Sequence, residues 1–128
     1  MTRAEFEQLV FDTYGIRADY PFEDDLVTGV FRHGASGKWF ALAMNISACK
    51  LLSDREGRTD VVNLKCAPEV IESLAGIERG IYPAYHMNKT HWLSVDLAEC
   101  EPGNVAWLLD ISFELTAPRR KGGTRVKN

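Results

Sequence analysis

The side chains that could carry out chemistry gather between residues 81 and 97. His86 and His91 lie five positions apart there, and Cys66 stands at the end of an earlier apolar stretch. Imidazole and thiolate groups are ligands that zinc prefers, and a cysteine beside a histidine is also a minimal nucleophile–base pair. A zinc site would need a fourth ligand, and neither helical nor finger-type spacing is present. Cys66 also falls on the inward face of its predicted strand, where a thiol is inert. We therefore expect no catalytic residue, no metal and no cofactor.

Polar and aromatic groups near the same stretch are suited to binding instead. Ammonium, amide and aromatic groups in one place can stack on or pair with a base, an anion or a partner. The alternative is structural, since Asn88 can hold a turn and Trp92 can pack on a neighbouring strand. The candidate residues for binding nucleic acid or a partner are Asn63, Lys65, His86, Asn88, Lys89 and Trp92.

Hydrophobic periodicity and turn residues predict the elements that position these groups. Thr2 followed by Glu5 is a capping-box signature at the start of a helix, and Gly15 is a stop signal. A four-residue connection with two glycines, 34–37, predicts a hairpin. Helices are predicted at 3–14, 68–75 and about 105–115, the last capped by Asn104; strands are predicted at 27–33, 38–44, 61–66 and 91–97, with a further one at 46–52.

The two later strands each have one apolar and one mixed face. Val62, Leu64 and Cys66 alternate with more polar neighbours, and Leu93 and Val95 do the same. Such alternation is typical of an antiparallel sheet with one face near water. The pattern predicts an α+β fold of two layers, an antiparallel sheet with helices packed on one face.

Length and composition agree with a globular protein that needs neither disulfides nor metal. The chain has 128 residues, of which 45% are hydrophobic, and its three cysteines are widely scattered. No apolar run is long enough to span a bilayer. We expect one domain at residues 1–117, a basic tail at 118–128, a cytoplasmic location, no membrane association and a monomer.

The net charge of −3 conceals an uneven distribution. Five of the 15 basic residues follow Ala117, which leaves 10 basic against 18 acidic residues in the rest of the chain. An acidic body is a poor starting point for nucleic-acid binding, which depends on neutralising phosphates. Glu23, Asp24 and Asp25 form a short acidic cluster, which we interpret as a solvated loop.

Two segments resemble the signature blocks of a known family. Val62 to Glu69 and Tyr85 to Trp92 are similar to those of the MmcQ/YjbR family, and shorter matches run from Pro21 to Leu115 in the expected order. The resemblance covers about residues 3–117. It departs at Ala67, where an aspartate that would cap the next helix is usual, and at Phe113, where tyrosine is common.

The resemblance implies a fold similar to CyaY (frataxin), with helices on one face of an antiparallel sheet. Members of the family are commonly described as DNA-binding, so it also implies DNA as a partner. The alternative is a protein-interaction or adaptor domain that presents its open sheet face to another polypeptide. Neither expectation includes an enzymatic activity.

Overall fold

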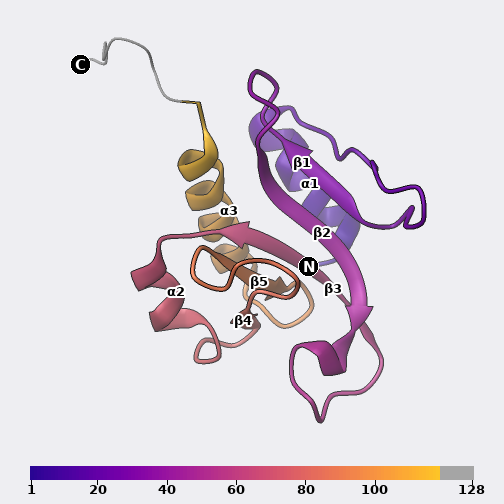
Figure 1. Cartoon of the computed structure of the whole chain (residues 1–128), viewed down its shortest axis with the longest axis vertical. Coiled ribbons are helices and arrows are strands. Elements are labelled where there is room, and N and C mark those ends of the chain that lie inside the picture. The colour runs from indigo at the N-terminus through magenta and orange to yellow at the C-terminus, as the bar shows by residue number, and fades with distance from the viewer. Residues whose placement is uncertain (119–128) are drawn as a thin grey trace.

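The computed structural model describes residues 1–118, arranged as a five-stranded sheet with three α-helices (Figure 1). The predicted basic tail lies outside these residues from Arg119 onward. The elements, in chain order, are α1 (Arg3–Tyr14), β1 (Gly29–Arg32), β2 (Trp39–Ser47), the 3-10 helix η1 (Ala48–Lys50), β3 (Arg58–Lys65), α2 (Pro68–Leu74), β4 (Ile81–Pro83), β5 (Trp92–Asp96) and α3 (Pro102–Thr116).

All neighbouring strands of the sheet are antiparallel, in the order β1-β2-β3-β5-β4. The central pairing aligns Asn63 with Ser94 and Lys65 with Trp92, so these four residues of the two strands are neighbours. The strand β4 was not predicted, because three residues are too few to show a period. The expected α+β fold is confirmed.

The first helix begins and ends where its capping residues predict. The Thr2 hydroxyl accepts a 3.1 Å hydrogen bond from the Glu5 amide, and the Glu5 carboxylate accepts one of 2.8 Å from the Thr2 amide. Gly15 ends the helix with a φ of 71°, a left-handed conformation that glycine adopts without strain. Phe6 and Val10 are the buried residues of this helix.

The start of α3 and the strand at 46–52 differ from the sequence prediction. Helix α3 begins at Pro102 with Glu101 as its N-cap residue, not at Asn104, because a proline is well tolerated in the first turn. The strand predicted at 46–52 is wrong: β2 continues to Ser47, and η1 then turns the chain. No side chain caps α2 at Ala67, as the loss of aspartate there predicts.

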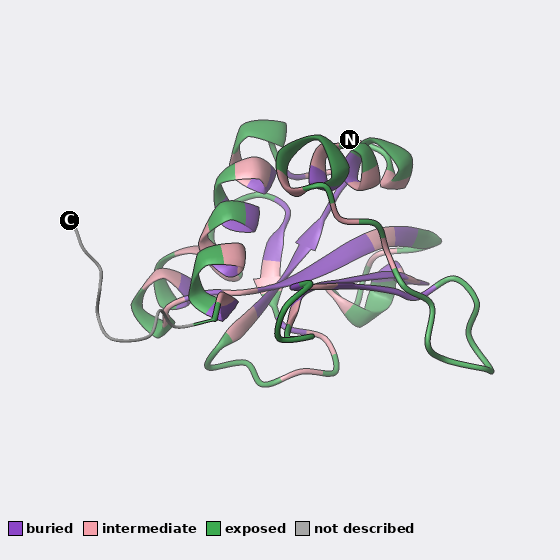
Figure 2. Cartoon of the chain, turned by 90° about the horizontal axis from the view of Figure 1, so that it is seen from above, coloured by how far each residue is buried: buried purple, intermediate pink, exposed green. Residues whose placement is uncertain are grey.

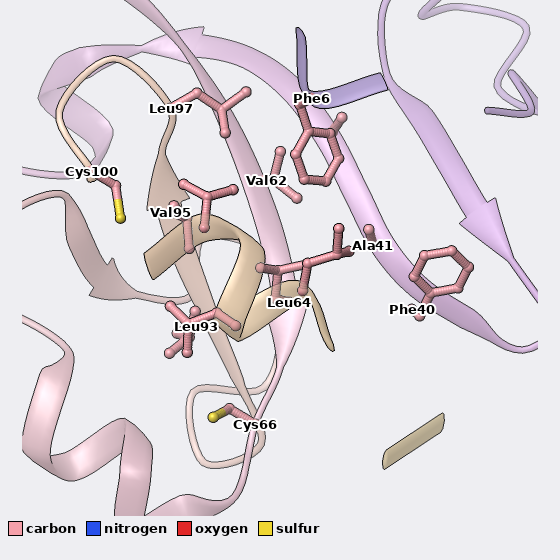
Figure 3. Packing of buried hydrophobic residues seen from close by; sticks show 14 of the residues in the cluster. Phe6, Phe40, Ala41, Val62, Leu64, Cys66, Leu93, Val95, Leu97 and Cys100 are labelled. Carbon is pink, nitrogen blue, oxygen red and sulfur yellow. The ribbon is translucent and has the colours of Figure 1, made fainter. Parts of the chain in front are cut away.

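Helices α1 and α3 lie on one side of the sheet, as Figure 2 shows, and the main core fills the space between. Figure 3 shows how side chains from α1, β2, β3 and β5 point into this core. Its fully buried members include Phe6, Phe31, Phe40, Leu64, Leu93 and Leu108. Within residues 1–118, no helix has both the length and the apolar character that a membrane span requires.

Ser112 of α3 links two strands where their pairing ends. The last paired residues of β2 and β3 are Ala41 and Leu64. One position further, the Ser112 hydroxyl donates a 2.6 Å hydrogen bond to the Phe40 carbonyl and accepts one of 2.8 Å from the Lys65 amide. The buried hydroxyl therefore takes the place of a missing bond between the strands.

The sheet face opposite the helices is less open than the sequence predicts. A second apolar cluster lies there, and the segments 20–28 and 84–91 run past it. Figure 2 shows loops, and neither α1 nor α3, on this side. The buried members of this second cluster are Val30, Leu42, Met44, Ile46 and Val61.

Candidate functional site

The segment 84–91 is fastened to the sheet by two buried polar side chains. Asn63 donates a 2.8 Å hydrogen bond to the Tyr85 carbonyl, and Ser94 accepts one of 2.8 Å from the Tyr85 amide. The two side chains are also bonded to each other, since the Ser94 hydroxyl donates to the Asn63 carbonyl oxygen at 2.6 Å. Both residues have no exposed surface. They hold Tyr85 by both of its backbone groups and so fix the position of the next residue, His86.

Further bonds within the segment set its shape. The Lys89 ammonium donates to the Ala84 carbonyl at 2.7 Å, which closes the loop across five residues. The Asn88 side chain accepts hydrogen bonds from the amides of Thr90 and His91, at 2.8 and 3.1 Å. An asparagine that bonds the backbone two and three residues further on is a common turn device.

His86 has a left-handed backbone conformation within this held loop. Its φ is 60°, and it is the one non-glycine residue with positive φ among residues 1–118. Its ring lies against that of Tyr85, with centroids 4.0 Å apart. A residue with a β-carbon adopts such a conformation at some cost in free energy, and sites where it persists are often functional.

The segment 20–28 is held on the other side of this face. Asp19 and Val30 exchange two backbone hydrogen bonds of 2.8 Å, and the Arg3 side chain donates to the Val27 carbonyl at 2.7 Å. The Asp25 carboxylate accepts hydrogen bonds from the amides of Val27 and Thr28 and from the Thr28 hydroxyl. These bonds, chiefly those from Thr28, hold the pKa of Asp25 below its usual value.

Between the two segments lies a hollow that we call the sheet-face groove. It consists of two adjoining cavities of about 530 and 330 Å³, which share Asp25, Thr28, Met44 and His86. Volumes of this size are typical of binding sites. The larger cavity is also lined by Pro21, Phe22, Glu23, Asp24 and Leu42, and the smaller one by Asn45, Ile46, Ser47, Lys50, Arg58 and Tyr85.

The two ends of the groove carry opposite charges. Glu23 and Asp24 stand at the end near Leu42, while Lys50 and Arg58 stand at the end near Ser47. None of these four charged side chains takes part in an ion pair within residues 1–118. Their charges are therefore free to act on a bound molecule.

Arg58 is already held in place at its end of the groove. Its guanidinium donates to the side-chain and backbone oxygens of Asn45, at 2.7 and 2.8 Å, and approaches the Ser47 hydroxyl at 3.4 Å. An arginine fixed in this way loses less side-chain freedom on binding an anion.

The structure places the six predicted residues in three different environments. Asn63 is buried and acts through the loop that it holds, and Asn88 and Lys89 bond the backbone of that loop. Lys65 and Trp92 are half-buried cross-strand partners. His86 alone among the six lines the groove.

The chemistry considered for cysteine and histidine finds little support in the geometry. Cys66 is buried, which raises the pKa of its thiol, and its amide donates to the His91 carbonyl at 2.9 Å. Within the part of the chain that the structure describes, no three or more His, Cys, Asp or Glu side chains converge as a metal site would require.

The sequence reasoning missed most of the groove. Leu42 and Met44 form its floor, and their predicted strand is apolar on both faces from Phe40 to Met44. A strand with two apolar faces indicates that something covers each of them, which was the available signal. The charged residues come from three separate segments, the loop 20–28, η1 and β3, so nothing in the spacing along the chain joins them.

Comparison with known proteins agrees with the fold and with the resemblance of the two signature blocks. The model of the YjbR family matches residues 11–115. The chain belongs to the YjbR family. The uncharacterized protein YyaQ of Bacillus subtilis (strain 168) is 39% identical to this YjbR chain over 117 residues, which cover 91% of the chain and 98% of YyaQ.

Solved structures similar to this YjbR chain come from two bacteria. A crystal structure from Pseudomonas syringae has a TM-score of 0.87 and 40% identity, and covers 91% of the chain and 100% of its own. A solution NMR structure from the same organism has a TM-score of 0.85 and 37% identity, with coverages of 98% and 100%. A Deinococcus radiodurans protein with a DUF419 domain has a TM-score of 0.66 and 25% identity, with coverages of 97% and 82%. This chain thus shares its architecture with solved proteins of two bacteria.

Proposed function

We propose that this chain is a non-catalytic binding module that holds a segment of a partner polypeptide in the sheet-face groove. One observation carries the proposal: an apolar floor formed by Leu42 and Met44 lies between two ends of opposite, unpaired charge. Polypeptides offer apolar and charged side chains at short intervals, so they match such a surface well. The acidic body of the chain does not oppose a protein partner as it opposes DNA.

A photo-crosslinking experiment tests this proposal in cells. A benzoylphenylalanine replaces His86 at the groove in one variant, and Trp107 in a matched control. Trp107 is 47% exposed and belongs to α3, on the helical side of the sheet. We expect covalent adducts with polypeptides from position 86 and none of the same adducts from position 107. Identical adducts from both positions, or none from position 86, would contradict the proposal.

DNA is the second candidate partner, and a separate cluster favours it. The register pairs Lys65 with Trp92 across β3 and β5, so a basic and an aromatic residue occupy neighbouring positions of the sheet, and Lys89 belongs to the loop just before β5. A cation beside an aromatic ring suits a phosphate and a stacked base. The family resemblance points the same way.

A titration at two salt concentrations tests the DNA candidate. Labelled duplex and single-stranded DNA are added at about 20 and about 150 mM salt, because phosphate contacts weaken steeply as salt rises. Lys65→Glu should abolish the binding, and Lys38→Glu, in the exposed β1–β2 connection, is the matched control. No binding near micromolar concentrations at the lower salt would exclude this function.

A further inference from the structure

The sheet-face groove has a direction set by its charges. Its floor follows β2 from Leu42, beside Glu23 and Asp24, to Ser47, beside Lys50. The five steps from Leu42 to Ser47 span about 17 Å, because a strand rises about 3.3 Å per residue. This distance exceeds the Debye length of about 8 Å at physiological salt, so the opposite ends hardly neutralise each other.

We propose that the groove selects an extended polypeptide segment in which a basic, an apolar and an acidic side chain follow one another. The basic side chain meets Glu23 and Asp24, and the acidic one meets Lys50 and Arg58. The apolar side chain covers Met44 and the adjoining floor. This inference rests on the proposed function and names the chemistry of the partner.

The middle of the groove favours an apolar contact. Leu42 and Met44 are 8% and 6% exposed, and Phe22 stands beside them with its ring edge-on to Trp39, at 6.3 Å between centroids. An apolar side chain placed there removes more of this surface from water, at about 25 cal/mol for each Å² buried. His86 forms the opposite wall of the middle part, since it lines both cavities.

The basic end favours a carboxylate. The Arg58 guanidinium donates three hydrogen bonds to oxygens of Asn45 and Ser47 on the neighbouring strand β2, and Lys50 lines the same cavity. The acidic side chain that lines this cavity with them is Asp25, whose oxygens accept hydrogen bonds from Val27 and Thr28. That carboxylate is already engaged, so it competes weakly for the two cations.

Three labelled peptides of equal length test the charge order by fluorescence anisotropy on the full chain at about 50 mM salt. All carry a central leucine; one has lysine and glutamate at its two ends, one has lysine at both and one has glutamate at both. We expect the mixed peptide to bind about two- to fivefold more tightly than the other two, which is the upper part of the range for one exposed charge pair. A peptide can turn end for end in the groove, so reversing its sequence is not a useful control.

Charge-reversed variants make the test specific. Lys50→Glu places an acid beside Arg58 and cancels the charge of that end, so it should remove the preference of the mixed peptide over the peptide with two lysines. The double variant Glu23→Lys, Asp24→Lys reverses the other end and should shift the preference to the peptide with two glutamates. Glu23, Asp24 and Lys50 are exposed and make no side-chain hydrogen bond within residues 1–118, so these changes leave the fold intact. Asp25 is left unchanged because it caps a turn.

The outcomes separate this inference from the proposed function. Equal binding of all three peptides, or a preference that Lys50→Glu leaves unchanged, overturns the charge-order proposal while crosslinks from position 86 still support a binding module. Failure of every peptide to bind overturns the charge-order proposal as well. If position 86 also gives no crosslink, the proposed function fails with it.

Discussion

The hydroxyl of Ser94 donates a 2.6 Å hydrogen bond to the side-chain carbonyl of Asn63 in a fully buried part of the sheet. Together the two side chains satisfy the amide and the carbonyl of Tyr85. A loop on the surface is thus held by polar groups that solvent does not reach. The bonds stabilise more than they would in water, because each group would otherwise lack a partner.

Replacing Asn63 should therefore destabilise the protein strongly. Asn63→Leu leaves the Tyr85 carbonyl without its partner and removes one from Ser94, at an expected cost of about 2–4 kcal/mol in the free energy of unfolding. Urea denaturation measures this cost. The control is Asn88→Ala, which removes two hydrogen bonds from an exposed part of the same loop and should cost about 1 kcal/mol or less. Equal effects of the two changes would show that the buried hydrogen bonds of Asn63 do not hold the loop 84–91 more strongly than the exposed bonds of Asn88 do.

Gly80 should tolerate alanine far less well than Gly76 does. The two have nearly the same φ, 81° and 79°, so the backbone strain of an added β-carbon is alike. At Gly80 that carbon would lie 2.5 Å from the Cys100 amide nitrogen, whereas at Gly76 nothing lies within 4 Å. Gly76→Ala should cost about 1–2 kcal/mol, and Gly80→Ala about 1–3 kcal/mol more. Thermal denaturation of both variants checks the difference, and equal melting temperatures would contradict it.

Element boundaries were predicted well where capping residues bond to the backbone only a few positions away. The boundaries of α1 match because Thr2, Glu5 and Gly15 specify both ends of the helix through bonds to its own backbone. The start of α3 did not match, because Pro102 and Asn104 are both acceptable starting signals and packing decides between them.

The site was predictable in part. Its loop was found, since His86 and Asn88 lie in one distinctive stretch, and the strands on either side of the central pairing, β3 and β5, were both predicted as strands. The role of Asn63 was not, because the alternation of a strand shows which face a side chain takes and not what covers that face. The groove brings together Glu23, Lys50 and His86, which lie far apart in the sequence. Their spacing along the chain therefore gives no indication that they line one groove.

His33 should make the stability depend on pH. Its Nε2 lies 2.9 Å from the Thr116 hydroxyl, whose own proton goes to the Ser112 carbonyl at 2.7 Å, so Nε2 carries the imidazole proton. Burial against Phe40 and Phe113 lowers the pKa of His33, and this outweighs the opposing effects of the Phe113 carbonyl and Glu114. The folded state then binds fewer protons than the unfolded state as the pH falls below the ordinary value of 6.5.

The contribution of His33 to the free energy of unfolding is therefore fully present above about pH 6.5 and is lost as the pH falls toward its lowered pKa. Urea denaturation between pH 5 and 8 should show a steeper decline for the natural chain than for His33→Gln. The exposed His91, replaced in the same way, serves as the control and should leave the slope unchanged. A slope that survives His33→Gln would assign the pH dependence to other groups.

The three cysteines should differ sharply in their reactivity toward a thiol reagent. Cys49 is exposed, whereas Cys66 and Cys100 are buried. Burial, aided by the nearby Glu78, raises the pKa of Cys100 to about 11, and burial raises that of Cys66 as well. At pH 8 Cys49 should react within minutes. Cys66 and Cys100 should react only as fast as local or global unfolding exposes them. Mass spectrometry locates the labels, and rapid labelling of Cys66 would contradict the packing of its strand.

The hydroxyl of Ser112 has a consequence for how the protein folds. Because a side chain of the last helix completes the bonding between β2 and β3, the sheet on its own lacks that link. Helix and sheet must then acquire their final form in the same event, which favours a single cooperative transition without a stable sheet intermediate. Helix α3 follows all five strands in the chain, so it would be the element that completes the folding of the sheet.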